Sequence, residues 1–246
     1  MNGKPKPMRV ASYNVHKCRG ADGKYRPDRI SAVLAEINAD LVALQEVDRR
    51  FGRRVGLLDP ARIQAETGLH LLVQSDLEDG HGWHGNALLV RGEPLSYRRT
   101  RMKLPGIEPR GAVVAELDLG QGPFRVVAAH LGLNPGCRSN QAAAIMAALA
   151  ASSPLPTVVL GDLNEWRPKG SALGVLAPWF GLAPSRPSYP SRLPMFSLDR
   201  ILGWPNGLVS DVEVHDTPLA RKASDHLPLK ATLNLGVNLP ALPFAA

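Results

Sequence analysis

The stretch "TVVLGDLNEW", residues 157–166, is a short apolar run followed directly by polar side chains. Val158, Val159 and Leu160 are typical of a strand that is covered on both faces. Side chains two positions apart on an extended chain share a face, so we expect Asp162 and Asn164 to point the same way and Glu165 to point away. The stretch therefore predicts a core strand that ends by presenting a carboxylate and a carboxamide together.

The same change from apolar to polar occurs where other predicted strands end. A single acid in this position is usually a turn former or a helix cap. Several such groups in equivalent contexts instead indicate one ligand-binding site at an edge of a sheet. The further members of the set are Asn14, His16, Glu46, His130, Asp199, Asp225 and His226.

The hydrophobic periodicity predicts a single mixed α/β domain over residues 1–246, with loose termini at 1–7 and 237–246. Two sheets packed face to face with helices outside would satisfy the pattern. Four runs at 85–91, 95–102, 111–119 and 124–131 are expected to form an antiparallel meander. The other expected strands are 8–13, 39–47, 69–73, 157–164, 197–202, 207–214 and 228–235, and the expected helices are 27–38, 60–67, 139–151 and 172–176.

The composition is that of an ordinary globular protein, with 44% hydrophobic residues and a mean hydropathy of −0.10 over 246 residues. No window approaches the roughly eighteen consecutive apolar residues of a membrane span, and the N-terminus lacks the apolar core of a secretion signal. Cys18 and Cys137 are too few for a disulfide framework, which favours free thiols in a reducing compartment. We therefore expect a cytoplasmic protein, and a monomer.

The chain is basic, with a formal net charge of +7 and a pI of about 9.7. The charge gathers in two segments, "RRFGRR" at 49–54 and "SYRRTRMK" at 96–103, in which the basic residues are Arg49, Arg50, Arg53, Arg54, Arg98, Arg99, Arg101 and Lys103. Such a balance favours an anionic substrate or partner, which could be nucleic acid, an anionic lipid surface or a phosphorylated metabolite.

The polar groups at the strand ends are suited to phosphate chemistry. Carboxylate and amide oxygens are the ligands that Mg²⁺ and Mn²⁺ prefer. A divalent ion, histidine and arginine side chains that bind an anion, and a carboxylate that orients water together describe hydrolysis of a phosphate ester. The sequence has no GxxxxGK[ST] loop and no GxSxG motif, which argues against an NTP-driven enzyme and a serine hydrolase.

The segments "SYNVH", "LQEV", "HL", "GDLN", "LDRI" and "SDHLP" resemble, in order and context, the motifs of the endonuclease/exonuclease/phosphatase superfamily, the DNase I-like metal-dependent phosphoesterases. The resemblance extends from Arg9 to Leu235. The segment "HGNALLVR" is similar to the "YGNALLSR" of a compact bacterial branch, with His84 in place of the tyrosine. This resemblance implies a four-layer α/β sandwich.

The resemblance also implies roles for the metal ligands and the attacking water. Glu46 would be the principal metal carboxylate, with Asn14 and Asp225 completing or supporting that set. The cofactor would be Mg²⁺ or Mn²⁺, as one or two ions. Asp162 would orient and deprotonate the attacking water, and Asn164 would hold the water or a phosphoryl oxygen.

The resemblance assigns four more residues to the same site. His226 would donate to the scissile phosphate, while Asp199 would fix its tautomer and favour the imidazolium. His130 matches a second histidine of the DNase I-like members. Arg110, in "EPRGAVV", lies where several members place an arginine or tyrosine that contacts phosphate.

The remaining histidines and Trp166 are given structural interpretations. His81 and His84 lie in a glycine-rich loop with no third ligand nearby, so we expect them to be exposed to solvent beside the cleft. His70 and His215 lie in strand-like runs, where packing is the simpler interpretation. Trp166 could stack on a base, but packing is again the simpler interpretation.

Two classes of function are left open by the sequence. The first is a phosphoesterase, more specifically a phosphodiesterase, that acts on nucleic acid or on a phospholipid or small phosphodiester. The second is a catalytically inactive binding module of the same fold that docks on nucleic acid or an anionic membrane through its arginines. The presence of Glu46, Asp162 and His226 favours the enzyme.

Overall fold

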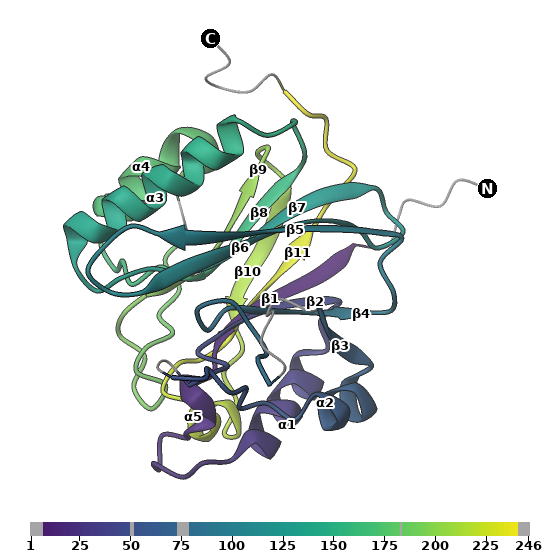
Figure 1. Cartoon of the computed structure of the whole chain (residues 1–246), viewed down its shortest axis with the longest axis vertical. Helices are drawn as coiled ribbons and strands as arrows, with labels where there is room; N and C mark the ends of the chain where they lie inside the picture. Colours follow the sequence, from purple (N-terminus) through teal and green to yellow (C-terminus); the bar gives the residue numbers. More distant parts are fainter. Residues whose placement is uncertain (1–6, 50–51, 73–78, 183, 241–246) are drawn as a thin grey trace.

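Two β-sheets form the centre of the molecule, and they pack face to face with helices on their outer sides (Figure 1). The structure is a computed structural model that describes residues 7–49, 52–72, 79–182 and 184–240. Arg50, Val73 and most of the two termini that the sequence predicts to be loose lie outside these ranges. The layered arrangement confirms the α/β sandwich that the sequence predicts.

The first sheet has six strands in the order β10-β11-β1-β2-β4-β3. In this sheet β1 and β2 run parallel, and every other pair of neighbouring strands is antiparallel. The mixed pairing brings the carboxyl ends of β1 and β2 to one edge of the sheet. The strands are β1 (Met8–Asn14), β2 (Leu41–Gln45), β3 (Leu69–Leu72), β4 (Ala87–Arg91), β10 (Val209–Val214) and β11 (Leu229–Leu233).

The second sheet has five strands in the order β5-β6-β7-β8-β9. Here β7 and β8 run parallel, and the other pairs are antiparallel. The carboxyl ends of β7 and β8 therefore meet the start of β9 at one edge. The strands are β5 (Ser96–Leu104), β6 (Arg110–Asp118), β7 (Pro123–His130), β8 (Thr157–Asp162) and β9 (Asp199–Trp204).

The prediction that four strands form one meander is wrong for the first of them. Strand β4 belongs to the six-stranded sheet, where it lies between β2 and β3, and only β5, β6 and β7 form a meander in the other sheet. The apolar residues of β4, from Ala87 to Val90, are all buried, as in a strand covered on both faces. Strand β5 is exposed or half-buried along most of its length, as suits the edge of a sheet.

The helices lie on the outer face of each sheet. Helices α1 (Pro27–Ile37) and α2 (Pro60–Thr67), with the short α5 (Ala220–Ala223), pack below the six-stranded sheet, and α3 (Pro135–Ala150) and α4 (Ser171–Phe180) cover the other (Figure 1). Helix α3 begins four residues before the predicted start, because Asn134 caps it by accepting the backbone N–H groups of Gly136 and Cys137. No helix among the described ranges is long and apolar enough to cross a bilayer.

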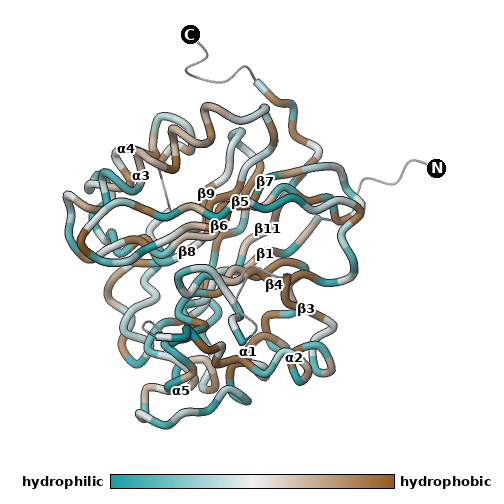
Figure 2. The backbone as a smooth tube through the Cα atoms, in the orientation of Figure 1, coloured by the Kyte–Doolittle hydropathy of each residue, from teal (hydrophilic) through white to brown (hydrophobic). Residues whose placement is uncertain are grey.

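A hydrophobic core fills the space between the sheets. Figure 2 shows hydrophobic residues, in brown, along central strands such as β4 and β7. Val158 and Leu160 of β8 and Val126 and Ala128 of β7 point into this core. The next inward positions along these two strands are Asp162 and His130, because every second side chain of a strand shares a face. The candidate site is therefore the polar end of the core between the sheets.

Candidate active site

The register of the five-stranded sheet places three polar side chains in one row. His130 of β7 is opposite Asp162 of β8, and Asp162 is opposite Asp199 of β9. Gly161 makes this close pairing possible, because a Cβ atom there would lie 1.8 Å from the carbonyl oxygen of Ala129. The glycine of "GDLN" thus permits the strand contact that aligns the row.

Asn164 reaches the site by a different route from the one that the sequence predicts. The strand ends at Asp162, and Asn164 has a left-handed backbone with φ of +50°. Its backbone N–H donates to Asp162 Oδ1 (2.9 Å), and its side-chain amide donates to the carbonyl of Leu131 (2.9 Å). The rule of alternating faces therefore does not apply to this residue, and a tight turn holds it beside Asp162 instead.

Three nitrogen atoms from separate elements surround Asp162 Oδ2. Asn14 Nδ2, at the end of β1, donates to it over 3.0 Å. His130 Nε2 lies 3.4 Å away and His226 Nε2 lies 3.8 Å away. All four side chains are buried. The two sheets thus meet at this carboxylate, and the residues that surround it come from distant parts of the sequence.

His226 is held by a second carboxylate. Its Nδ1 lies 2.9 Å from Asp199 Oδ2, which also accepts the Ser188 hydroxyl over 2.6 Å. Burial alone lowers the pKa of His226, but the charges of Asp199 and Asp162 outweigh it and raise this pKa to about 10. His226 is therefore an imidazolium at neutral pH. The ring of Tyr189 packs against it at a tilt of 46°, with the centroids 4.8 Å apart.

His130 is in the opposite electrostatic environment. Arg110 Nη1 lies 3.0 Å from its Nδ1, and a guanidinium can only donate, so Nδ1 accepts and Nε2 carries the proton toward Asp162. Burial lowers the pKa of His130 to about 4, an effect that Asp162 opposes and the Arg110 charge reinforces. His130 is therefore neutral at physiological pH.

Glu46 follows β2 and lines a pocket beside His130. The pocket is formed by Lys17, Glu46, Asp48, Arg54, His84, Gly85, Pro109, Arg110 and His130. Burial opposes ionisation of Glu46, but two positive charges outweigh burial and lower its pKa to about 2: that of His130, which is protonated in the acid range where Glu46 titrates, and that of the Lys17 ammonium in contact with it. Burial has the larger effect on Asp48, whose pKa is raised to about 6. Glu46 is thus the more acidic of the two carboxyl groups in this pocket.

Asp225 and His16 lie together on the other side of Asn14. Asp225 Oδ1 is 3.6 Å from His16 Nδ1, and both side chains are about one-third exposed (32% and 37%). The hydroxyl of Ser224 donates to the backbone carbonyl of Asn14 over 2.7 Å. This contact ties the "SDH" turn to the end of β1, so Asp225 joins the site although it precedes His226 directly.

The donor groups suit a divalent cation that prefers oxygen. Glu46, Asn14 and Asp225 supply carboxylate and amide oxygens, as Mg²⁺ and Mn²⁺ require. Asp162, Asp199 and His226 also form a buried group whose ligand atoms lie within 4.8 Å of one another and could hold a metal ion. In this second group the imidazolium of His226 has no lone pair to offer, so only the oxygens of Asp162 and Asp199 could bind an ion while His226 is protonated.

Several residues near the site are absent from the sequence predictions. Lys17 reaches Glu46 because three successive residues, His16 to Cys18, have left-handed backbone angles that turn the chain sharply after β1. Arg54 lies 3.9 Å from Asp48 and lines the same pocket. A positive φ in residues other than glycine has no reliable sequence signal, so periodicity alone could not find these contacts.

The four histidines that the sequence analysis does not assign to the site form two groups, one near the Glu46 pocket and one away from it. His81 and His84 are half-buried, contrary to the expectation of exposure. His81 accepts the backbone N–H of Leu58 (3.3 Å) and packs over Gly56, where a Cβ atom would lie 2.2 Å from the ring. His84 lines the Glu46 pocket. His70 and His215 contact Glu93 and Glu36 rather than any residue of the site.

Glu165 and Trp166 follow the "GDLN" motif with different roles. Glu165 is buried and accepts from Arg138 (3.2 Å) and Ser171 (2.8 Å), as befits a structural residue. Trp166 is half exposed, so its ring is packed only in part. Its ring contacts Phe196 in an edge arrangement with the centroids 5.9 Å apart.

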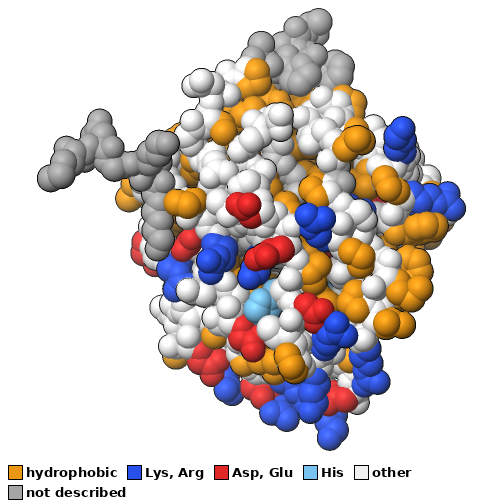
Figure 3. Space-filling model, turned by 180° about the vertical axis from the view of Figure 1, so that it is seen from behind, with side chains coloured by type: hydrophobic (Ala, Val, Ile, Leu, Met, Phe, Trp, Pro, Cys, Tyr) orange, Lys and Arg blue, Asp and Glu red, His pale blue; other side chains and the backbone are white. Residues whose placement is uncertain are grey.

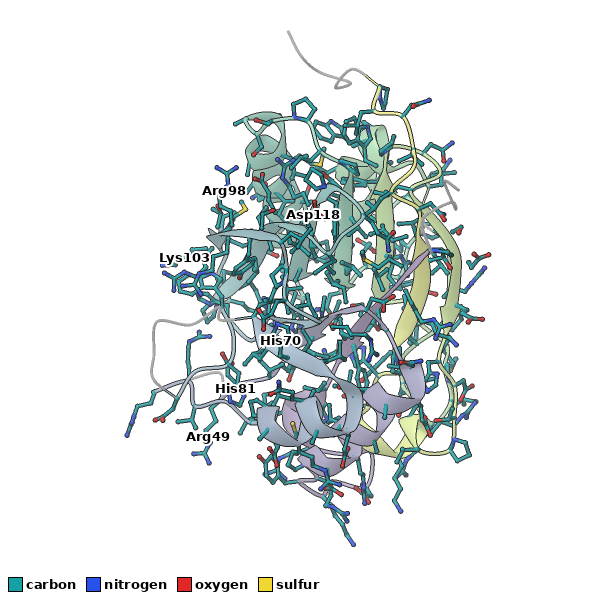
Figure 4. The ribbon with its side chains drawn as sticks, turned by 90° about the vertical axis from the view of Figure 1, so that its right-hand side faces the viewer. Arg49, His70, His81, Arg98, Lys103 and Asp118 are labelled. Carbon is teal, nitrogen blue, oxygen red and sulfur yellow. The ribbon has the colours of Figure 1, made fainter. Side chains whose placement is uncertain are left out.

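The two basic segments lie on the same side of the molecule. In Figure 4, Arg98 and Lys103 of β5 project on the left, with Arg49 below them. Arg98 pairs with Glu116 over 2.5 Å, and Arg53 pairs with Asp79 over 2.8 Å. Part of the basic charge is thus neutralised on the surface, while Arg54 and Arg110 turn into the Glu46 pocket.

The fold and the site define a class of protein. The model of the endonuclease/exonuclease/phosphatase family matches residues 11–226, and the chain belongs to this family. The match contains every candidate site residue from Asn14 to His226. Members of the family are phosphoesterases and nucleases that generally use divalent metal ions.

Relatives of known sequence and structure agree with this assignment. The uncharacterized protein YbhP of Escherichia coli K12 is 28% identical over 248 residues, which covers 93% of this chain and 96% of YbhP. An endonuclease/exonuclease/phosphatase from Beutenbergia cavernae superposes with a TM-score of 0.72 at 22% identity, covering 96% of this chain and 73% of that one. A mannosyl-6-phosphatase from Bacteroides thetaiotaomicron has a TM-score of 0.63 at 15% identity, covering 91% and 98%.

Proposed function

We propose that this protein is a divalent-metal-dependent phosphodiesterase. The observation that carries the proposal is the convergence on one oxygen, Asp162 Oδ2, of an amide donor, a neutral histidine and an imidazolium. A carboxylate that orients water beside a cation that binds phosphate is the arrangement required for in-line attack on a phosphate ester. The family assignment supports the same chemistry.

Asp162 acts as the general base in this proposal. It takes the proton of the attacking water, and Asn14 and the backbone of Asn164 fix its two oxygens in place. The Asn164 side chain, anchored on the Leu131 carbonyl, holds the water or a phosphoryl oxygen. Two hydrogen bonds from separate segments thus restrain the base before substrate binds, which reduces the cost of orienting it.

His226 and Asp199 form the pair that acts on the phosphate. The imidazolium donates to a non-bridging oxygen, where negative charge increases in the transition state. Asp199 holds the ring through Nδ1 and keeps it protonated. On the other side of Asp162, His130 donates from Nε2, and Arg110 fixes that tautomer from within the Glu46 pocket.

Glu46, with Asn14 and Asp225, would hold Mg²⁺ or Mn²⁺. A bound divalent ion supplies charge stabilisation to the phosphoryl oxygens and lowers the pKa of a coordinated water. Lys17 contacts Glu46 directly, so the ammonium balances the carboxylate charge from the pocket side. The other groups of the site act by orienting, donating or accepting protons.

The test is hydrolysis of bis-p-nitrophenyl phosphate and p-nitrophenyl phosphate with Mg²⁺ or Mn²⁺, repeated in EDTA. We expect the diester to be turned over faster than the monoester, and EDTA to abolish both activities. Asp162→Asn should reduce kcat by about 10²–10⁴-fold, because it removes the base at almost unchanged volume.

Asp211→Asn, at an exposed position of β10, is the matched control and should retain full activity. Melting temperatures of both variants check that the fold is intact. If the intact protein turns over neither ester, nor a panel of nucleic acids and phospholipids, the alternative of an inactive binding module replaces the enzyme.

A further inference from the structure

Exposed apolar side chains gather around the mouth of the candidate site. Ten large hydrophobic residues are exposed among the described residues, and six of them lie on loops at the edge of the sheets where the site is found. We call these six residues the docking rim: Ile107, Leu133, Trp166, Leu193, Met195 and Phe196. They belong to the loops β5–β6, β7–α3, β8–α4 and α4–β9, so four separate loops contribute to one surface.

Contacts between these loops show that the rim is continuous. Trp166 and Phe196 are in contact, and Leu133 lines one groove together with Trp166 and Asn164. The backbone N–H of Leu133 donates to Glu108 Oε1 over 3.2 Å, which brings the loop of Ile107 alongside. The rim therefore begins at a residue of the proposed site and extends outward from it.

Two residues of the rim project from a turn that is fixed to the site. Tyr189 and Phe196 form an antiparallel bridge, and Leu193 and Met195 lie in the turn between them, exposed by 67% and 63%. The ring of Tyr189 packs against that of His226 in a tilted arrangement, so the base of the turn contacts the proposed phosphate-binding cation. Such apolar side chains at the tip of a turn gain no burial in the isolated protein.

Basic side chains accompany the apolar ones. The Arg167 guanidinium lies over the Trp166 ring at 5.1 Å, and Lys103, Lys169 and Arg192 are exposed on the same loops or strand ends. Figure 3 shows hydrophobic side chains gathered toward the right-hand edge of that view with Lys and Arg side chains beside them. This edge is on the left in Figure 1, where β5 ends.

We propose that the docking rim binds the surface of a phospholipid bilayer that contains anionic lipid. Leu193, Met195 and Trp166 would enter the interfacial region, and the accompanying arginines and lysines would contact lipid phosphates. The proposal rests on the proposed function, because it names a phosphodiester in a lipid headgroup as the group delivered to Asp162 and His226.

The chemistry of the rim favours a bilayer over nucleic acid. Aromatic side chains can stack on bases, but Ile107, Leu133, Leu193 and Met195 are aliphatic and have no stacking surface. A nucleic acid backbone also offers no apolar phase in which such side chains could be buried, whereas a membrane interface does. The apolar side chains of the rim match the interfacial region of a bilayer, and the adjacent cations match its anionic headgroups.

The test is co-sedimentation of the 246-residue chain with sucrose-loaded vesicles, in EDTA so that no hydrolysis occurs. Vesicles of phosphatidylcholine with phosphatidylglycerol should bind it, and pure phosphatidylcholine vesicles should bind it more weakly. Leu193→Ser and Met195→Ser should each weaken binding by about ten-fold, as expected for the loss of one buried aliphatic side chain.

Leu95→Ser is the matched control. Leu95 is 77% exposed in the turn before β5, at the opposite end of the sheet from the site, and its replacement should leave vesicle binding unchanged. Trp166 is the single exposed tryptophan of the four, so its emission should shift to shorter wavelength on binding, and Trp166→Phe should abolish the shift but retain binding.

Two outcomes would overturn the proposal. One is an absence of binding to both kinds of vesicle, or an equal loss in Leu95→Ser and Leu193→Ser. The other is binding to a DNA or RNA duplex that Leu193→Ser and Met195→Ser abolish while vesicle binding persists. Asp162→Asn should bind vesicles like the unchanged protein, so failure of the lipid proposal and failure of the enzyme proposal give different results.

Discussion

Two histidines approach the same oxygen of Asp162 from opposite flanks, and they carry opposite charge states. On one flank, His226 is paired with Asp199 and its pKa is raised to about 10. On the other flank, His130 is paired with Arg110 and its pKa is lowered to about 4. Burial lowers the pKa of both rings, but the charges of Asp199 and Asp162 reverse this effect for His226, whereas for His130 the charge of Arg110 adds to it. One carboxylate thus lies between a fixed cation and a neutral donor.

The largest effect that separates the two flanks should come from replacing each histidine by asparagine. His226→Asn removes the cation that binds the phosphate, and we expect kcat to fall by about 10²–10⁴-fold. His130→Asn removes a neutral hydrogen bond and should cost about ten-fold or less. Steady-state kinetics on bis-p-nitrophenyl phosphate measures both, and an equal loss in the two variants would show that the flanks do not differ in function.

A smaller effect should follow from changing the partner behind each ring. Asp199→Asn retains the volume but removes the charge that keeps His226 protonated. Hydrogen bonds to charged groups contribute about 1.5–3 kcal/mol, so we expect a loss of about 10–100-fold in kcat/KM.

The corresponding change on the other flank is Arg110→Met. It should raise the pKa of His130 rather than lower that of His226, because the guanidinium opposes protonation of His130. The pH dependence of kcat/KM distinguishes the two variants. In the unchanged protein, kcat/KM should fall at high pH as His226 loses its proton, and Asp199→Asn should shift this fall to lower pH. A pH profile that is unchanged in both variants would contradict the charge states assigned to the two histidines.

The smallest effect should appear in the pH dependence of stability, and its sign differs between the flanks. His226 has a raised pKa, so its contribution is fully present below pH 6.5 and is lost as the pH rises through about 10. His130 has a lowered pKa, so between pH 6.5 and about 4 the unfolded chain binds a proton that the folded protein does not. Stability therefore decreases as the pH is lowered from 6.5 to about 4.

Urea unfolding at a series of pH values would show these two contributions. His226→Asn should flatten the curve above pH 6.5, and His130→Asn should flatten it below. Each slope should change by at most about 1.4 kcal/mol per pH unit, the value for one proton. Parallel curves for the two variants and the unchanged protein would contradict the opposite assignments.

The layered fold and most of the site could be predicted from sequence, because both depend on alternation along strands. Val158 and Leu160 fill the core, and the next inward position is Asp162. Pairing between strands is harder to predict. Strand β4 looks like the first strand of a meander, and only its burial on both faces places it in the other sheet.

The parts of the site that sequence reasoning missed depend on irregular backbone. Asn164 lies beside Asp162 through a left-handed turn, and Lys17 contacts Glu46 through three left-handed residues. Periodicity describes regular elements, so it has no information about such turns. The different charge states of His130 and His226 depend on burial and on Arg110 and Asp199, which become their neighbours only after the sheets have formed.

The most direct test of the account is the protonation state of the two rings, measured by ¹H–¹⁵N correlation spectra of ¹⁵N-histidine-labelled protein in EDTA at neutral pH. The variants His130→Asn and His226→Asn assign the signals. We predict that both nitrogens of His226 are protonated and that His130 is neutral with its proton on Nε2. Two neutral rings, or two charged ones, would contradict the claim that Asp162 lies between a cation and a neutral donor.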